Sequence, residues 1–258
     1  MTPHPKSLKI LLTNDDGIHA PGLWILYHAL EADCRLTVVA PERERSAVGH
    51  GITLHKPLRV HKEVVNGGEQ GWAVTGTPAD CVKLAMVELL DERPDLVISG
   101  INPGANTGVN MNYSGTVAAA KEASLYQVPA LAVSVAHGEH PPYEIAAKFI
   151  HRLVPLIITK GLPPGVFLNV NVPEIAGNVL PDVKITHQGC DTYCECFEKR
   201  RDPRNRVYYW QGYESQPNYS RSDSDGAVLS AGQISITPAR CDMTDYDMLE
   251  ELKQWDIG

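Results

Sequence analysis

Two adjacent aspartates follow the first apolar run of the chain. Asp15 and Asp16 lie in the segment TNDDG at 13–17, directly after LKILL at 8–12. If this run is a buried strand, carboxylates at its end repel each other and lose hydration, which is unfavourable unless a cation or hydrogen-bond donors compensate. A hard divalent cation such as Mg²⁺ or Mn²⁺ compensates through oxygen ligands. The alternative, on local composition alone, is a turn at Asp16-Gly17 with Asp15 as a helix cap.

A charged segment, PERERS at 41–46, follows the second apolar run. At the carboxyl end of a strand its Ser46 could supply a neutral oxygen ligand to a metal, and one of its arginines could meet a phosphate. The alternative is a solvated loop. Two histidines, His50 and His55, come shortly afterwards. Each could shuttle a proton, although a surface or packing role is the default for a histidine whose partner is unknown.

The third polar segment is the loop GINPGANTG at 100–108, which comes after the apolar run at 96–99. Its three glycines permit positive φ angles and the close approach of a ligand. Asn102 and Asn106 offer carbonyl oxygens to a cation or amides to a phosphate. A long loop rich in glycine and asparagine inside a compact domain is usually functional, so we expect this loop to form part of a site.

A helix is expected to begin at Ser114, Gly115 and Thr116. The free N–H groups and the helix dipole at such a start form a cradle for an anion. Together with Asn14 and Asn106, these three residues are our candidates for phosphate binding. The alternative is a plain capped helix that follows a flexible loop.

The elements that must position these residues alternate along the chain. Continuous apolar runs predict buried parallel strands covered by helices on both faces, at 8–12, 36–40, 96–99 and 130–135. The predicted helices begin at or near Pro21, Thr77, Ser114 and Tyr143. This alternation predicts an α/β fold with a doubly wound, mostly parallel sheet. Ligands bind at the carboxyl ends of the strands in such sheets, which is where all three polar segments fall.

The pattern changes after residue 165. Shorter strands are predicted there, separated by polar stretches with Pro, Gly and Asn, at 167–172, 183–186, 207–210 and 234–237. The intervening polar stretches predict projecting hairpins or arms, of the kind that serve oligomerisation. We expect one domain over 1–258, with a core at about 1–165 that carries the site. C-terminal β-hairpin or arm extensions are expected at about 166–258.

Composition excludes several classes of function. The 258 residues are 43% apolar and 21% charged, an ordinary balance for a globular protein. The chain has 23 Lys and Arg against 31 Asp and Glu, a net charge of −8. We therefore do not expect it to bind the backbone of DNA or RNA irrespective of base sequence. Apolar runs fall short of the roughly 20 residues of a membrane-spanning helix, and the start lacks the apolar core of a secretory signal. We therefore expect a cytoplasmic protein that does not enter a membrane.

The six cysteines favour reduced thiols, because a chain of this length does not need disulfides. Cys190, Cys194 and Cys196 form a C-x3-C-x-C cluster whose spacing is not that of a zinc finger. Free thiols are the default interpretation of this cluster, and a structural zinc ion is the alternative. Three other templates are absent: the phosphate loop of NTPases, G-x-G-x-x-G after the first strand and G-x-S-x-G.

Several segments, in this order, match the motifs of a known family. The main ones are LLTNDDGIHAPG (11–22), VVAPERERS (38–46), GTPADCV (76–82), and ISGINPGANTG followed by YSGTVAAAKEA (98–123). RDPRNRVYYWQG (201–212) and ISITP followed by TDY (234–246) match later segments, so the match runs through nearly the whole chain. By these motifs the chain resembles the SurE (survival protein E) family of metal-dependent nucleotidases.

The resemblance implies a phosphomonoesterase that hydrolyses nucleoside 5′- and 3′-monophosphates to nucleoside and phosphate, and in some members short polyphosphate. It implies one divalent cation, Mg²⁺ or Mn²⁺, per subunit, with Asp15, Asp16, Ser46 and Asn102 as the ligands. These four residues are among those that follow the predicted strands. It also implies a Rossmann-like core whose carboxy-terminal parts exchange between subunits, giving a homodimer or homotetramer.

Two positions depart from the family pattern. Ala47 follows Ser46 where the family commonly has glycine, and Ser124 stands where glycine is frequent. We expect the change at Ala47 to alter how the Ser46 loop reaches a metal, so the resemblance does not carry over a preference for base or sugar.

In the expected mechanism, a divalent cation polarises the phosphoryl oxygens and lowers the pKa of a bound water that attacks phosphorus. Asn106 and the helix start at 114–116 hold the phosphate oxygens. Asp15 and Asp16 are the candidate catalytic residues. Asp15 orients or deprotonates the water, and a covalent nucleophile is the alternative. The alternative function is a non-catalytic nucleotide-binding regulatory protein, which would bind AMP without a divalent cation.

Overall fold

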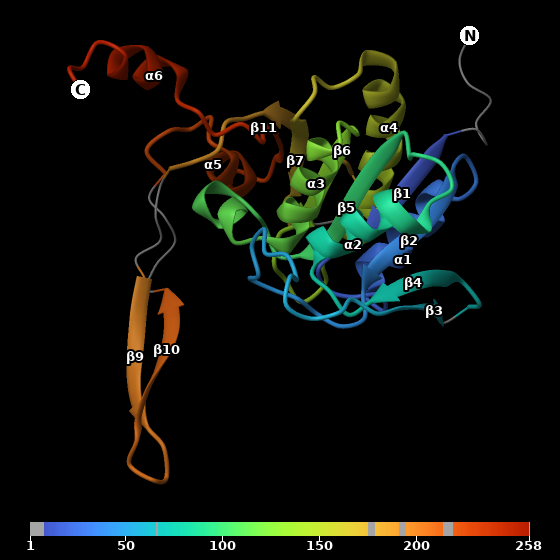
Figure 1. The fold of residues 1–258 in the computed structure, drawn as a ribbon, viewed down its shortest axis with the longest axis horizontal. Helices are drawn as coiled ribbons and strands as arrows, with labels where there is room; N and C mark the ends of the chain where they lie inside the picture. The colour runs from blue at the N-terminus through green and yellow to red at the C-terminus, as the bar shows by residue number, and fades with distance from the viewer. Residues whose placement is uncertain (1–7, 66, 175–178, 191–194, 214–218, 258) are drawn as a thin grey trace.

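The computed structural model describes residues 8–65, 67–174, 179–190, 195–213 and 219–257. These residues form a central nine-stranded sheet (Figure 1). Its strands are β1 (Lys9–Thr13), β2 (Arg35–Pro41), β3 (Val60–Val64), β4 (Gln70–Val74), β5 (Leu96–Pro103), β6 (Ala130–Val135), β7 (Val166–Val172), β8 (Val183–Ile185) and β11 (Ile234–Arg240). Across the sheet they lie in the order β3-β4-β2-β1-β5-β6-β7-β11-β8.

The middle of the sheet is parallel. Strands β2, β1, β5, β6 and β7 pair in parallel, with Leu12 of β1 opposite Val38 on one side and Ile98 on the other. Antiparallel pairs occur where β3 joins β4 and where β11 joins β7. The predicted α/β fold with a mostly parallel sheet is confirmed, and the carboxyl ends of β1, β2 and β5 meet at one edge.

Helices cover both faces of the sheet (Figure 1). The described segments form the helices α1 (Pro21–Leu30), α2 (Pro78–Leu84), α3 (Gly115–Leu125), α4 (Tyr143–Lys160), α5 (Asp225–Ser230) and α6 (Tyr246–Leu252), with a π-helix at Ala85–Leu89 and a 3₁₀-helix at Gly108–Asn112. Of these, α6 lies apart from the sheet and has no buried residue (Figure 1). One face is covered by α1 and α4, whose apolar side chains pack in one buried cluster with the sheet. The other face is covered by α2 and α3, which contribute to a second cluster.

The helix starts follow the local sequence. Pro21 is the first residue of α1, where its missing N–H costs nothing. Thr77 caps α2 through a capping box with Asp80, in which each side chain accepts from the backbone N–H of the other residue. Ser114 caps α3 by accepting from the Val117 amide at 3.1 Å. The predicted starts of these three helices are confirmed.

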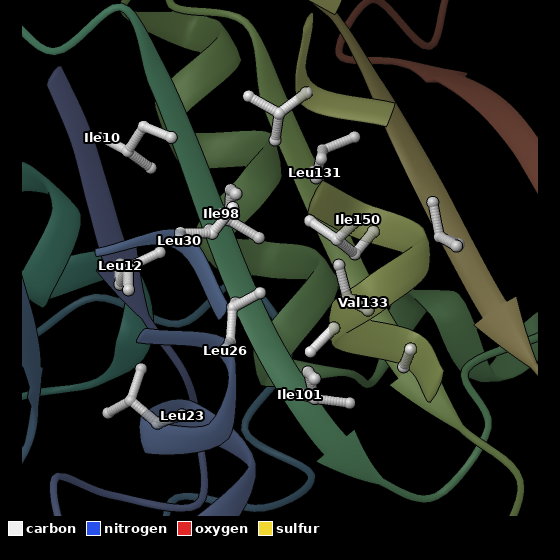
Figure 2. Packing of buried hydrophobic residues seen from close by; sticks show 14 of the residues in the cluster. Ile10, Leu12, Leu23, Leu26, Leu30, Ile98, Ile101, Leu131, Val133 and Ile150 are labelled. Atoms are coloured by element: carbon white, nitrogen blue, oxygen red, sulfur yellow. The ribbon is translucent and has the colours of Figure 1, made fainter. Parts of the chain in front are cut away.

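Apolar side chains of α1 and α4 lock these helices against the sheet (Figure 2). Leu26 and Leu30 of α1 are fully buried in one cluster with Ile98 of β5 and Leu131 of β6. Burying such a side chain stabilises the fold by roughly 1.5–3 kcal/mol. This face therefore anchors the strands whose ends carry the polar segments.

Part of the predicted loop at 100–108 is strand. β5 continues to Pro103, and its register against β6 shifts between Ser99 and Asn102. Pairing resumes with Asn102 opposite Ser134, so sheet hydrogen bonding overrides the glycine and proline content. The remaining loop is shorter than predicted, and Asn102 lies on the strand itself.

The C-terminal third both extends the sheet and projects from it. Strands β7, β8 and β11 join the central sheet. β9 (Glu195–Arg201) and β10 (Val207–Tyr213) pair in antiparallel fashion as a hairpin that points away from the body (Figure 1). The predicted C-terminal β-hairpin is thus confirmed. Within the described segments, every helix is too short or too polar to span a bilayer.

Candidate active site

A cavity of about 610 Å³ opens at the carboxyl edge of the sheet. Its walls include five of the nine residues proposed from the sequence as catalytic, metal-binding or phosphate-binding, which are Asp15, Ser46, Asn102, Asn106 and Ser114. These residues come from the ends of β1, β2 and β5, from the loop after β5 and from the cap of α3. The parallel sheet thus brings together residues that are up to about 100 positions apart in the chain.

Asp15 is buried against the start of α3. It is 5% exposed, and the Thr116 hydroxyl donates a hydrogen bond to its Oδ1. A Cβ on Gly115 would lie 2.7 Å from the Cβ of Asp15, so only glycine permits this close approach. Burial raises the pKa of Asp15, and hydrogen bonds from the hydroxyl and backbone of Thr116 oppose that rise. The helix start therefore positions and partly stabilises the Asp15 carboxylate.

Asp16 carries an unsatisfied carboxylate oxygen. Its Oδ2 is buried without a hydrogen-bond partner among the described residues. Burial, together with the charges of Asp15 and Glu44, raises the pKa of Asp16 to about 7. The pKa of Tyr143 is raised as well, mainly by burial and in addition by the negative charge of Asp16. The pair of aspartates thus forms a site of excess negative charge that a cation would stabilise.

A backbone hydrogen bond joins the loops after β1 and β2, and the side chain of Asn14 shapes the first of these loops. The Arg45 amide donates to the Asp15 carbonyl at 2.7 Å. The side chain of Asn14 is fully buried, and it donates to the Gly17 carbonyl at 2.9 Å and accepts from the Gly17 amide at 3.2 Å. Gly17 has a φ of +100°, and a Cβ there would lie 3.0 Å from the Arg43 carbonyl carbon. Asn14 therefore shapes the loop, with both ends of its amide engaged.

Ser46, in the loop after β2, and Asn102, on β5, both line the cavity. Ser46 is exposed, and its hydroxyl donates to Glu44 Oε1 at 2.5 Å. Asn102 Nδ2 donates to the Gly104 carbonyl at 2.6 Å. Because this bond occupies the amide nitrogen, Oδ1 of Asn102 is the end that a cation would contact. Ala47, next to Ser46, adopts a φ of +55°, in the left-handed region that favours glycine.

Asn106 is fixed by a buried polar network that the sequence analysis missed. Its backbone N–H donates to Asn171 Oδ1 at 2.8 Å, and its side-chain Nδ2 donates to Ser134 Oγ at 2.8 Å. Its carbonyl accepts from Nδ2 of Asn169 at 2.7 Å and of Asn171 at 3.2 Å. The missed signal was the NVN at 169–171 inside an apolar strand, where fully buried asparagines require partners.

The segment after Ser46 is tied to α3 through Glu122. His50 Nε2 lies 2.7 Å from Glu122 Oε2, and Lys83 Nζ lies 3.1 Å from Glu122 Oε1. Burial alone would raise the pKa of Glu122, but the hydrogen bonds from His50 and Lys83 lower it overall. His50 therefore anchors the loop on the buried Glu122, whereas His55 is exposed.

The cysteines singled out from the sequence do not line the cavity in the part of the chain that the structure describes. Cys190 is exposed, Cys196 is partly buried, and both are free thiols. Cys194 lies outside the described residues. Where the structure describes the chain, no three His, Cys, Asp or Glu side chains gather around a point suited to a metal ion. A cation at Asp15 and Asp16 would therefore depend on neutral oxygens as well.

Fold and cavity together define an α/β protein with an acidic, oxygen-lined site at the carboxyl edge of a parallel sheet. The family model described as Survival protein SurE matches residues 10–195. The chain belongs to the SurE family, as its motifs indicated.

Known relatives match the chain along almost its whole length. A 5′-nucleotidase SurE from Desulfatibacillum aliphaticivorans is 52% identical over 250 residues, which cover 97% of this chain and 99% of the relative. A 5′-nucleotidase SurE from Heliobacterium modesticaldum is 47% identical over 249 residues, covering 96% and 92%. The crystal structure of the SurE protein from Aquifex aeolicus matches with a TM-score of 0.83 and 36% identity, covering 95% of this chain and 98% of that one.

Proposed function

We propose that the protein is a metal-dependent 5′-nucleotidase that hydrolyses nucleoside monophosphates to nucleoside and phosphate. The two curated relatives carry the name 5′-nucleotidase and align over nearly the whole chain, which supports this reaction class. For this chain itself, the observation that carries the proposal is the aspartate pair, a buried Asp15 and a partly buried Asp16, beside a cavity large enough for a small ligand.

The residues around the pair fit a hard divalent cation. The orphaned Oδ2 of Asp16 and the raised pKa values of both aspartates are unfavourable features that a cation would relieve. We propose that Asp15, Asp16, Ser46 and Asn102 hold one Mg²⁺ or Mn²⁺ per subunit. Such a cation supplies Lewis-acid chemistry, because it polarises phosphoryl oxygens and makes water more acidic.

The remaining side chains divide between phosphate contact and positioning. One N–H of the Asn106 amide is taken by Ser134, so the other is available to a phosphate oxygen. Ser114 Oγ accepts from Val117, which leaves its O–H to donate. Asn106 and Ser114 are therefore proposed to contact the phosphate. Asn14, Gly115 and Thr116 face the aspartates and their loop, and we assign them a positioning role instead.

The nucleoside is proposed to lie at the outer part of the cavity. Tyr113 lines this part and is 60% exposed, so its ring is free to stack on a base. Asn110 and Gln211 also line the cavity and offer amides to base or sugar. Gln211 belongs to β10, so the projecting hairpin contributes to the substrate side of the site. Asp15 is the residue proposed to orient or deprotonate the attacking water.

Phosphate release tests the proposal directly. AMP, GMP and a 3′-nucleotide are incubated with EDTA-treated protein and then with Mg²⁺ or Mn²⁺. Release that requires the cation is expected, and Asp15→Asn should remove most of it while circular dichroism stays unchanged. Asp91→Asn, a change at an exposed aspartate outside the site, is the matched control. Binding of AMP without any hydrolysis, or release that ignores EDTA, would contradict the proposal and favour the regulatory alternative.

The exposed apolar side chains of the C-terminal third support self-association as a homodimer or homotetramer. On the hairpin, Phe197, Tyr209 and Trp210 are 61%, 58% and 60% exposed. None of the residues of α6 is buried within one copy of the chain. Light scattering of the purified protein should give two or four times the mass of one chain, and Trp210→Glu should reduce it. A monomer at micromolar concentration would exclude this assembly.

We also propose a cytoplasmic location. The described cysteines, which include the partly buried Cys34 and the exposed Cys190, are free thiols, and thiols persist in a reducing compartment. Fractionation of cells that express the protein checks this location.

A further inference from the structure

A second cavity, of about 370 Å³, shares the segment 42–47 with the first. The end of this segment lines the first cavity, and its beginning lines the second. Four basic side chains line the second cavity, namely Arg43, Arg45, Lys56 and Arg59. Such clustering is unexpected in a chain with a net charge of −8, and it concentrates positive potential at one place.

These basic groups are not neutralised by the protein. Across the described segments, none of the four lies within 4.0 Å of a carboxylate oxygen. Glu42 also lines the cavity but forms no such pair. The buried acid nearby, Asp80, is already engaged: it accepts from the Thr53 hydroxyl at 2.6 Å and from the Thr77 amide at 2.9 Å.

Arg45 carries the most specific signal for a ligand. Its Nη2 donates to the Thr75 carbonyl at 2.9 Å, which fixes the guanidinium in place. Its Nε is buried and has no hydrogen-bond partner among the described residues. A buried donor without an acceptor is unfavourable, and an anion with several oxygens would satisfy it.

Neutral donors are available around the same cavity. Thr75 Oγ1 accepts from the Arg59 amide at 2.9 Å, so its hydroxyl proton can be donated elsewhere. This bond also fixes the backbone of Arg59 against the turn that follows β4. Positively charged side chains beside a hydroxyl suit a tetrahedral oxyanion, and a planar guanidinium can donate hydrogen bonds to two phosphate oxygens at once.

We propose that this second cavity binds a phosphate group, separately from the aspartate pair and without a divalent cation. The ligand class is an oxyanion with a charge near −2, either inorganic phosphate or the phosphate of a small phosphomonoester. Arg45 and Arg59 supply charged donors, and Lys56 supplies a further positive charge. Because the Arg45 amide also contacts the Asp15 carbonyl, the two sites share a structural element but no proposed ligand.

Calorimetric titration of inorganic phosphate into EDTA-treated protein tests this proposal. One phosphate is expected to bind per chain. The double variant Lys56→Ala, Arg59→Ala should weaken binding by about tenfold or more, since two charged partners are lost. Both residues are exposed, so the variant should fold. Lys148→Ala, at another exposed lysine, tests for a general effect of charge and should leave the affinity unchanged.

Competition distinguishes the two sources of the phosphate group. AMP that displaces phosphate in EDTA identifies a phosphomonoester site, whereas phosphate that AMP does not displace identifies a site for the free ion. No binding of phosphate at millimolar concentration overturns the proposal. Equal affinities in the double variant and in Lys148→Ala also overturn it. Cation-dependent hydrolysis is measured separately, so failure here is distinguishable from failure of the proposed function.

Discussion

The imidazole Nε2 of His50 lies 2.7 Å from Oε2 of Glu122, and this contact joins the segment that carries Ser46 to helix α3. Glu122 is 4% exposed and keeps a second partner, Lys83. The two partners therefore provide a matched pair of tests. His50 holds the loop of the proposed cation site, and Lys83 does not.

His50→Ala is expected to raise the Mn²⁺ concentration needed for half-maximal activity several-fold, because Ser46 loses its anchor. Stability should fall by about 1–3 kcal/mol, since a buried carboxylate loses a hydrogen bond. Lys83→Ala should lower stability comparably but leave the Mn²⁺ requirement unchanged. Urea unfolding and metal titration of activity measure the two effects. An equal change in metal requirement for both variants would show that His50 has no specific role.

Thr116→Val should shift the acidic limb of the pH–rate profile to higher pH. Burial raises the pKa of Asp15, and the Thr116 hydroxyl opposes that rise. Valine has the same shape but no donor, so the carboxylate would bind its proton more tightly and compete less well for a cation. The profile of kcat/KM against pH at fixed Mn²⁺ measures the shift. Thr116→Ser, which keeps a hydroxyl, should restore the wild-type profile, and an unshifted valine variant would refute the role of the hydroxyl.

The contribution of Asp16 to the stability of the EDTA-treated protein should decrease as the pH rises from about 4 to about 7. Between the ordinary pKa of 3.8 and the folded value of about 7, Asp16 keeps its proton only in the folded chain. The unfolded state then binds fewer protons, so the free energy of unfolding falls with increasing pH. Below that window the carboxyl is protonated in both states, and above it the loss is complete.

Asp16→Asn removes this titration. The variant should melt at a higher temperature than the wild type at pH 8 in EDTA, and Mn²⁺ should stabilise it much less. Asp91→Asn serves again as the control, and it should behave like the wild type. Thermal melts at several pH values, with and without Mn²⁺, provide the comparison. A variant whose melting temperature rises with Mn²⁺ as much as that of the wild type would exclude Asp16 as a ligand.

Ala47 adopts a conformation that suits glycine better, with a φ of +55°. A non-glycine residue in this region costs roughly 1–2 kcal/mol, and the greater freedom of glycine in the unfolded chain offsets about 0.4–1 kcal/mol of that. Ala47→Gly should therefore increase stability by about 1 kcal/mol or less and keep activity. Ala47→Val should lower both. Chemical unfolding and phosphate release measure the pair, and a destabilised glycine variant would contradict this account.

Asn171→Ala should destabilise the protein by about 1–3 kcal/mol, because the buried backbone N–H of Asn106 loses its acceptor, Oδ1 of Asn171. Turnover should fall as well, since Asn106 lines the cavity and depends on this contact for its position. Asn112→Ala, at an exposed asparagine whose side chain donates a hydrogen bond to the Val109 carbonyl, is the control. Stability and kcat should change together in the first variant and not in the second.

The strands and helix caps that lie in or next to apolar runs were predicted correctly from the sequence. β1 and β6 are continuous buried runs, and Thr77 and Ser114 precede helices as caps, so local chemistry was sufficient for them. β3 and β4 were not predicted. The sequence VHKEV of β3 is mostly exposed and carries charge, and its strand state depends on pairing with β4.

The same distinction holds for the site. Asp15, Ser46 and Asn102 were predicted from their places after strands, and the sheet brings all three to one cavity. Their roles as ligands stay predictions. The support from Asn169 and Asn171 was not predicted, because it depends on how β7 lies beside β6 and on a loop about 65 positions away. Long-range packing of this kind leaves no local signature except a polar residue in an apolar run.

The bond from the Arg45 amide to the Asp15 carbonyl joins two loops through their main chains, with no side chain involved. Substitution at either position leaves the connection in place, because every residue except proline retains the amide at 45. The spacing of the oxygens that these two loops contribute is thus set by the backbone. If a divalent cation binds as proposed, ions of different radius would meet oxygens from these two loops at a nearly constant spacing, and this spacing would favour one ionic radius over others.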